Sequence, residues 1–271
     1  MIKADFHTHT SFSGDSDAEM ALMVSASINA GLDFLCITEH MDIDYPTDQG
    51  TPAGFFEFDA AAYRQRYIEV RDAFADKINL LWGVEMGLQT HIADEISDYV
   101  NSYPYDFVIG SSHLCHGIDL YYPAFYECRP EEEAYREYFE SISEILEVCN
   151  DFDVYGHLDY AVRYGPNQNK YYSYEKYGDI LDDILKKLIS KGKGLDVNTK
   201  GLLVGLGEPN PSIAILKRYR ELGGEIITCG SDAHSPEHVG YKFKELSELL
   251  IECGYKYYSV FKNRQPEFWK I

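Results

Sequence analysis

The sequence predicts one α/β domain of the closed-barrel class, in which a ring of parallel strands is surrounded by helices. Short apolar runs alternate with stretches of helical periodicity along all 271 residues, which is typical of βαβ units and a mainly parallel sheet. About seven such units can be counted. Nearly every predicted strand ends in a His, Glu or Asp, and a closed barrel presents all of its strand ends on one face.

Length and composition are consistent with this prediction. A chain of 271 residues fits one large α/β domain or two small ones. Hydrophobic residues make up 45% of the sequence, which is enough for a sizeable core. Because no low-complexity linker and no block of like charge divides the sequence, we assign residues 1–271 to a single domain.

Each predicted strand is a short apolar run followed by polar or turn residues. A continuous apolar run is typical of a strand that is buried on both faces, as the strands of a parallel sheet are. The predicted strands are 2–7, 34–38, 78–84, 107–113, 154–157, 194–198 and 226–229, with a last strand at 256–261.

Between the strands, apolar residues recur with the helical period. Ser16 and Asp17 are candidate N-cap residues for the first helix, and Gly31 follows its last turn. The predicted helices are 18–30, 59–74, 92–100, 131–150, 177–191, 211–222 and 236–253. Three long insertions, at 41–58, 114–129 and 160–174, would hang over the face where the strands end.

Charge and cysteine content limit the possible partners. The formal net charge of −21 opposes binding to a phosphate backbone, and no basic stripe is visible, so we expect no nucleic-acid partner. The six cysteines are scattered without a C-x-x-C motif, which is typical of reduced thiols in a cytoplasmic protein. No apolar run approaches the roughly 20 residues of a membrane span and no leader pattern opens the chain, so we expect no membrane partner.

The residues at the strand ends form a set of metal ligands. His7 and His9 stand two apart, so on a strand both imidazoles point to the same face. Because no cysteine accompanies the histidines, the mixed nitrogen and oxygen donors favour a catalytic Zn, Mn or Fe site over a structural zinc site. The nine candidate ligands are His7, His9, Asp15, His40, Glu85, His113, His157, Asp232 and His234.

Each of these residues also has a purely structural interpretation. His40 could begin a helix, Glu85 could cap one, and His157 could bond to a nearby carbonyl. Donors at the ends of six different strands on one predicted face are harder to explain that way, so we predict a site with more than one metal ion. We expect His91 and His238 at the surface, and the sequence leaves the role of His116 open.

The motifs that carry these ligands resemble those of the PHP (polymerase and histidinol phosphatase) family, in the same order along the chain. Three further stretches, at 195–202, 208–212 and 231–240, resemble its histidinol-phosphate phosphatase branch. The ligand motifs are DFHTHT at 5–10, ITEH at 37–40, GVE at 83–85, GSSH at 110–113, GHLD at 156–159 and GSDAH at 230–234.

The resemblance implies a distorted (β/α)7 barrel with a trinuclear centre of divalent Zn, Mn or Fe ions. It implies one metal held by His7, His9, Glu85 and Asp232, a second by Glu85, His113 and His157, and a third by Asp15, His40 and His234. Many relatives have a histidine at the position of Asp15, so the third site here has more oxygen character. The implied reaction is hydrolysis of L-histidinol phosphate, in histidine biosynthesis, by a hydroxide that bridges two metals.

Several residues receive catalytic or substrate-binding roles under this hypothesis. Glu85 would bridge two metals, and either Asp232 or His234 would protonate the leaving group. Arg163 is our candidate clamp for the substrate phosphate, because a guanidinium group binds phosphate in a fork. Lys200 is a second candidate, and Asn198 is placed where it could touch the substrate.

Three other functions stay open at this point. The chain could be a phosphodiesterase or nuclease of the same fold, or act on a different small phosphate monoester. It could be a PHP module that binds without catalysis, although every ligand position is filled. It could also be an amidohydrolase-type enzyme, which uses His-x-His on a barrel as well. The sequence does not predict the oligomeric state.

Overall fold

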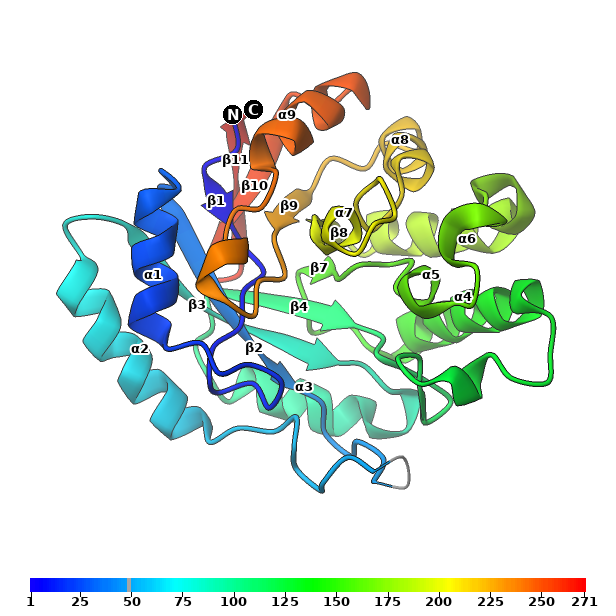
Figure 1. Cartoon of the computed structure of the whole chain (residues 1–271), viewed down its shortest axis with the longest axis horizontal. Helices are drawn as coiled ribbons and strands as arrows, with labels where there is room; N and C mark the ends of the chain where they lie inside the picture. Colours follow the sequence, from blue (N-terminus) through cyan, green and yellow to red (C-terminus); the bar gives the residue numbers. More distant parts are fainter. Residues whose placement is uncertain (48–49) are drawn as a thin grey trace.

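The computed structural model, which describes residues 1–47 and 50–271, contains a ring of seven parallel strands with helices around it (Figure 1). In spatial order the strands are β1 (Ala4–Asp5), β2 (Phe34–Met41), β3 (Asn79–Gly87), β4 (Phe107–Ser111), β7 (Val154–Tyr155), β8 (Gly194–Asn198) and β9 (Ile227–Gly230). The ring closes between β1 and β9, where the Phe6 amide donates to the Cys229 carbonyl at 2.9 Å. The predicted α/β barrel is therefore confirmed.

The longest strands carry polar residues inside the sheet. Strand β2 is buried along its whole length and runs three residues beyond the predicted end, because the ladder continues through the pair His40↔Glu85. Strand β7 is shorter than predicted: it stops at Tyr155, and the backbone turns at His157, which has a φ of 24°. Strand β1 is likewise only two residues long, and the unequal strand lengths distort the barrel.

The helices lie outside the ring and cover the strands (Figure 1). The longer helices are α1 (Met20–Asn29), α2 (Ala60–Phe74), α3 (Ala93–Asn101), α4 (Glu131–Val148), α6 (Tyr174–Ser190), α8 (Ile213–Glu221) and α9 (Phe243–Glu252). The short ones are α5 (Ala161–Tyr164), α7 (Lys200–Leu203), η1 (Thr90–Ile92), η2 (Pro123–Phe125), η3 (Gln168–Lys170) and η4 (Pro236–His238). Among the described residues, none of these helices combines the length and the apolar character that crossing a bilayer requires.

Two helix predictions need correction. The N-cap of α1 is Glu19, whose carboxylate accepts from the Ala21 amide, and not Ser16 or Asp17. The Ser16 hydroxyl instead donates to the His234 carbonyl. The helix predicted at 236–253 is interrupted, because Lys242 adopts a left-handed conformation between η4 and α9.

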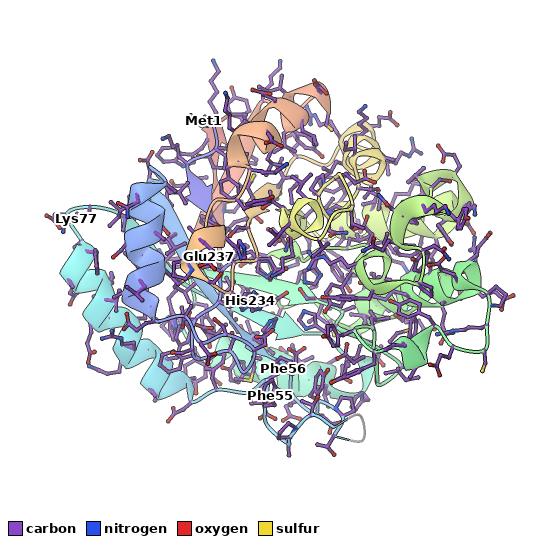
Figure 2. All side chains as sticks on the ribbon, in the orientation of Figure 1. Met1, Phe55, Phe56, Lys77, His234 and Glu237 are labelled. Carbon is purple, nitrogen blue, oxygen red and sulfur yellow. The ribbon has the colours of Figure 1, made fainter. Side chains whose placement is uncertain are left out.

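The three insertions lie above the ends of β2, β4 and β7, as predicted. The second contains a small hairpin of β5 (Leu114–Cys115) and β6 (Ile118–Asp119). The side chain of Phe56, from the first insertion, and that of His234 lie near each other in Figure 2. Both rings contact His40, with centroid distances of 5.6 and 5.8 Å. The first insertion therefore contacts the strand-end residue His40 directly.

A hairpin of β10 (Tyr257–Lys262) and β11 (Gln265–Lys270) closes the opposite end of the barrel. Phe261 packs on Phe107 inside the ring, with centroids 5.1 Å apart. At the hairpin turn, Arg264 Nε lies 2.6 Å from Asp153 Oδ2, just before β7. Only β10 was predicted, at 256–261.

Replacement of Arg264 by alanine is expected to destabilise the fold by about 2 kcal/mol, because the largely buried Asp153 carboxylate would lose its guanidinium partner. Urea denaturation followed by circular dichroism measures this change. The control is Arg71→Ala, which removes an exposed pair with Asp72 and should change stability by less than about 0.5 kcal/mol. Equal effects of the two variants would contradict a structural role for the hairpin turn.

Candidate metal centre

The structure places all nine predicted metal ligands together at the carboxyl ends of the strands. The fully buried Glu85 of β3 lies at the centre of the group, and histidine rings surround both of its oxygens. The distances to Oε2 are 3.0 Å from His7 Nε2, 3.2 Å from His40 Nδ1 and 3.4 Å from His9 Nε2. The distances to Oε1 are 3.0 Å from His157 Nε2 and 3.3 Å from His113 Nε2.

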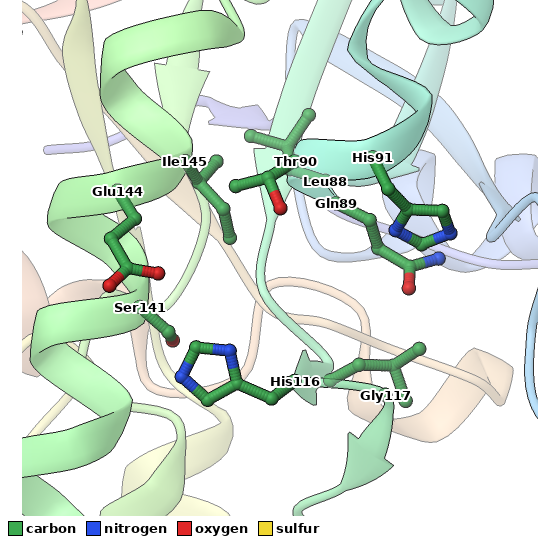
Figure 3. Close-up of a pocket in the computed structure, with 10 residues that line it drawn as sticks. Leu88, Gln89, Thr90, His91, His116, Gly117, Ser141, Glu144 and Ile145 are labelled. Atoms are coloured by element: carbon green, nitrogen blue, oxygen red, sulfur yellow. The ribbon is translucent and has the colours of Figure 1, made fainter.

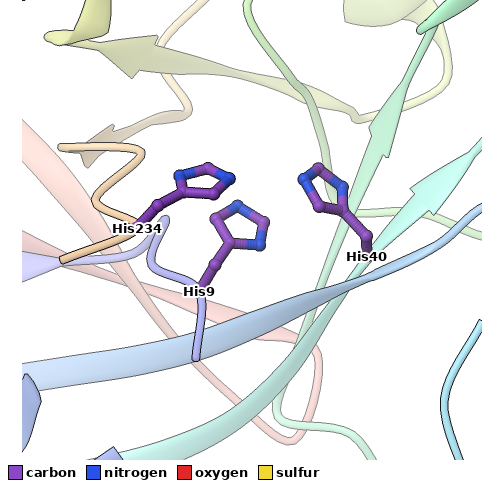
Figure 4. Close-up of side chains that lie close together, drawn as sticks. All are labelled: His9, His40 and His234. Carbon is purple, nitrogen blue, oxygen red and sulfur yellow. The ribbon is translucent and has the colours of Figure 1, made fainter. Parts of the chain in front are cut away.

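His9, His40 and His234 form a second group next to Glu85. The His9 ring stacks against both of the others, with centroid distances of 4.2 Å to His40 and 4.3 Å to His234, and the three rings form a triangle (Figure 4). Asp15, on the rim, places Oδ2 3.1 Å from His234 Nε2 and 3.6 Å from His40 Nε2. Asp232 Oδ1 lies 3.7 Å from His9 Nε2 and so connects this group with the first.

Local backbone geometry explains why these side chains converge. His7 and His9 alternate with Thr8 in an extended segment that pairs with residues after β9, through the parallel bridge Thr8↔Ala233. Both imidazoles therefore point toward the barrel axis. Asp232 has a left-handed φ of 55°, and its amide donates to the His7 carbonyl at 2.8 Å. This turn brings the Asp232 carboxylate over the end of the barrel.

Metal ions would satisfy the donor atoms of the cluster better than hydrogen bonds within the cluster do. The buried atoms His9 Nε2 and His40 Nδ1 have no hydrogen-bond partner among the described residues, although carboxylate oxygens lie 3.4 and 3.2 Å away. Divalent ions, which bind imidazole nitrogen at about 2.0–2.1 Å, would satisfy such atoms. Several triplets of donors lie within 4.8 Å of one another, including His7 with His9 and Glu85, Glu85 with His113 and His157, and His9 with His40 and His234.

The pKa shifts of Glu85 and His9 favour their metal-binding forms. Burial alone would raise the pKa of the Glu85 carboxyl, but His7, His40 and His113 outweigh burial and hold that pKa well below its usual range. Burial and the neighbouring rings of His40 and His234 hold the pKa of His9 well below its usual range. An ionised carboxylate and a neutral imidazole are the forms that bind a metal. Burial would lower the pKa of His7 and of His113, but nearby carboxylates outweigh it and raise both, so these two rings would release a proton when a metal binds.

Three carboxylates that the sequence analysis did not select orient the histidines. They act on the ring nitrogens that do not face Glu85. Asp196 Oδ2 lies 2.9 Å from His7 Nδ1, and Asp42 Oδ1 lies 2.7 Å from His113 Nδ1. Glu39 accepts a hydrogen bond from the hydroxyl of Ser13, which lies 3.1 Å from His9 Nδ1. The sequence signal was available for Asp196, which is a charged residue inside the apolar strand predicted at 194–198.

Replacement of Asp42 by asparagine should weaken metal binding about 10- to 100-fold, because a carboxylate behind a ligating imidazole fixes its tautomer and increases its basicity. The apparent affinity can be measured by competition with a chromogenic chelator. Asp44→Asn is the matched control, because the one ion pair of Asp44 among the described residues is with the exposed His91. Unchanged affinity in Asp42→Asn would show that His113 does not depend on Asp42.

A cavity of about 290 Å³ lies above the cluster. Arg163 enters it from α5, with Nη1 2.8 Å from Asp232 Oδ2 and Nε 2.7 Å from Asn210 Oδ1. Its Nη2 is buried and has no partner among the described residues. Lys200 lines the cavity too, whereas Asn198 does not: Asn198 lies beneath Asp232 and donates to it at 3.1 Å.

The remaining histidines lie elsewhere. His91 and His116 are exposed and line a separate pocket of about 200 Å³ near η1 and α4 (Figure 3). His238 is partly exposed in η4. None of the nine ligands lines the pocket in Figure 3. The surface positions predicted for His91 and His238 agree with the structure.

Comparisons with known proteins agree with this geometry. Residues 5–200 match the family model of the PHP domain. The chain is 32% identical to a histidinol-phosphatase of Lactococcus lactis, with 97% of this chain and 96% of the relative covered. It is 29% identical to a probable histidinol-phosphatase of Thermotoga maritima, with 94% of each covered.

Solved structures give the same result for the fold. A crystal structure of histidinol phosphate phosphatase from Lactococcus lactis, complexed with zinc, L-histidinol and phosphate, superposes with a TM-score of 0.88. That protein is 31% identical, and the match covers 98% of both chains. A putative histidinol phosphatase from Listeria monocytogenes superposes with a TM-score of 0.78 at 21% identity, covering 90% of this chain and 99% of the other.

Proposed function

Because the chain belongs to the PHP domain family, we propose that it is a metal-dependent phosphatase that hydrolyses L-histidinol phosphate to L-histidinol and phosphate. The observation that carries this proposal is the group of nine donors around Glu85, beneath a cavity lined by Arg163, whose Nη2 has no partner among the described residues. The reaction would serve histidine biosynthesis. Free, mostly buried cysteines agree with a reducing compartment such as the cytoplasm.

The relatives support the choice of substrate. The Lactococcus lactis protein whose structure contains zinc, L-histidinol and phosphate matches almost the whole chain at 31% identity. An alternative substrate class, a phosphodiester of nucleic acid, is disfavoured by the net charge of −21.

The donor set supports three divalent ions, of Zn, Mn or Fe. We assign one to His7, His9, Glu85 and Asp232, one to Glu85, His113 and His157, and one to Asp15, His40 and His234, with Glu85 shared between the first two. When bound, such ions neutralise phosphoryl oxygens and lower the pKa of water, so that a nucleophile forms at neutral pH.

The residues of the cavity would bind and orient the substrate. The Nη2 of Arg163, which has no partner in the described part of the chain, would donate to a phosphoryl oxygen, while its other two nitrogens are held by Asp232 and Asn210. Lys200 adds a second positive charge at the same end. Asp232 and His234 both line the cavity. Burial would raise the pKa of Asp232, but His7, Lys200 and Arg163 hold it well below its usual range. Of the two predicted donors, His234 is therefore the one that could deliver a proton to the leaving alkoxide. Asn198 would act through Asp232, because it does not reach the cavity.

The proposal is tested on the purified protein by two measurements. Elemental analysis should find Zn, Mn or Fe bound at more than one ion per chain. Phosphate release should be faster from L-histidinol phosphate than from other monoesters or from bis(p-nitrophenyl) phosphate. A metal content near zero, with no hydrolysis after Zn, Mn or Fe is added, would overturn the proposal, and preference for the diester would replace phosphatase with phosphodiesterase activity.

A further inference from the structure

The cavity above the metal cluster continues into a smaller chamber that the proposed chemistry does not use. The chamber has a volume of about 50 Å³ and shares Asp15, His40, His113 and Tyr160 with the main cavity. Its other walls come from the first two insertions: Asp42, Tyr45, Phe56 and Asp119. We call this space the side chamber. Its position next to His40 and His113 makes it accessible to a substrate whose phosphate lies over the metal cluster.

Asp119 is the one carboxylate of the side chamber that has no basic partner. Its carboxylate accepts hydrogen bonds from the Tyr45 hydroxyl and, at 2.8 Å, from the Tyr121 amide, and it is 7% exposed. No Lys, Arg or His among the described residues forms an ion pair with it, and Asp48 and Gln49 carry no positive charge. A buried carboxylate without a counter-ion is costly, and because Asp119 lines a cavity, a cationic ligand could reach it and offset that cost.

Among the described carboxylates that line the two cavities, Asp119 alone lacks a basic partner. Asp5, Glu39 and Asp159 are also buried without one, but neutral donors satisfy them and they line neither cavity. Asp42 lies 2.7 Å from His113 Nδ1, and Asp232 lies 2.8 Å from Arg163 Nη1. Burial raises the pKa of the Asp119 carboxyl above its usual value, as expected where desolvation is not offset by a cation. A bound cation would offset it.

The walls of the side chamber are aromatic. Phe56 packs on Tyr45 with centroids 4.8 Å apart, and Tyr160 lies against His113 at 5.5 Å. Aromatic faces beside a carboxylate suit an organic cation, because the rings attract positive charge and cover the flat or aliphatic part of the molecule. The two ends of the combined cavity thus differ in sign: Arg163 and Lys200 lie at one end and Asp119 at the other.

We propose that Asp119 binds the ammonium group of the substrate and selects phosphate monoesters of amino alcohols over neutral ones. This inference rests on the proposed function, since it assumes that a phosphate monoester occupies the main cavity. The phosphate is held over the metal cluster by Arg163, and the cationic part enters the side chamber. Asp119 is therefore a specificity-determining residue for the reaction.

The test compares Asp119→Asn with the unaltered enzyme on L-histidinol phosphate and on p-nitrophenyl phosphate, whose organic part is uncharged. Asparagine keeps an oxygen acceptor for the Tyr121 amide, which faces Oδ1. Its NH2 group can donate to the Tyr45 hydroxyl, which faces Oδ2, so the loop is expected to keep its structure. The ratio of kcat/KM for the cationic to the neutral substrate should fall about 100-fold, as for loss of one partner of a buried ion pair. The inhibition constant of free L-histidinol should rise by a similar factor of about 100. The inhibition constant of inorganic phosphate should change by less than about threefold.

The matched control is Glu127→Gln, which removes the same charge from an exposed position of the same insertion and should leave the ratio unaltered. If the unaltered enzyme does not hydrolyse L-histidinol phosphate, the proposed function fails. If it does, and Asp119→Asn lowers kcat/KM for both substrates equally or for neither, only the assignment of Asp119 fails.

Discussion

Glu85→Gln is expected to lower turnover by about 1,000-fold or more and to remove most of the bound metal. The Glu85 carboxylate faces five histidine rings, all within 3.4 Å of one of its oxygens. An amide of the same shape has no negative charge and offers one acceptor in place of two, so it cannot serve two metal ions. The loss should appear both in phosphate release and in metal content by elemental analysis.

Glu85→Asp tests whether the length of the side chain matters in addition to its negative charge. Aspartate keeps the negative charge but is one methylene shorter, so it cannot contact both groups of histidines. We expect metal content between those of the unaltered enzyme and of Glu85→Gln. Glu127→Gln controls for the change in net charge, and circular dichroism shows whether each variant is folded. Full metal content and turnover in Glu85→Gln would contradict a bridging role.

The barrel could be predicted from the sequence because parallel strands in a ring leave their carboxyl ends on one face. His7, Glu85 and Asp232 are far apart along the chain, yet each follows or ends an apolar run. The position of a donor at the end of an apolar run can be recognised in each strand alone. The structure keeps the donors at the strand ends, even though β2 and β3 extend beyond the apolar runs. The strand-end donors were found for this reason.

The contacts of the residues behind the histidines could not be predicted in the same way, although Asp196 itself stands out as a charged residue in an apolar strand. Asp42 and His113 are 71 residues apart, and Asp196 and His7 are 189 residues apart. Their contacts depend on the turn of the chain after β2 and on the closure of the ring, which no local pattern specifies. Strand β11 was missed for a related reason: nearly all of it is exposed, so it has no buried stripe, and pairing with β10 makes it a strand.

Arg163→Ala is expected to lower kcat/KM about 1,000-fold, as for other arginines that stabilise charge on a transferred phosphoryl group. The guanidinium is held by Asn210 and Asp232, so that Nη2 is fixed in place before substrate binds. Without the guanidinium, the transition state loses a preorganised hydrogen-bond donor, and Asp232 loses its buried ion-pair partner. Steady-state kinetics with L-histidinol phosphate, together with inhibition by inorganic phosphate, measure both effects.

Arg163→Lys distinguishes the geometry of the group from its charge. Lysine keeps the positive charge but has one nitrogen, so it cannot bind Asn210, Asp232 and a phosphoryl oxygen with separate donors. We expect activity closer to that of Arg163→Ala than to that of the unaltered enzyme. Arg136→Ala, which breaks a surface pair with Asp179, is the control. Full activity in Arg163→Lys would mean that positive charge alone is needed there, and that the network through Asn210 serves stability.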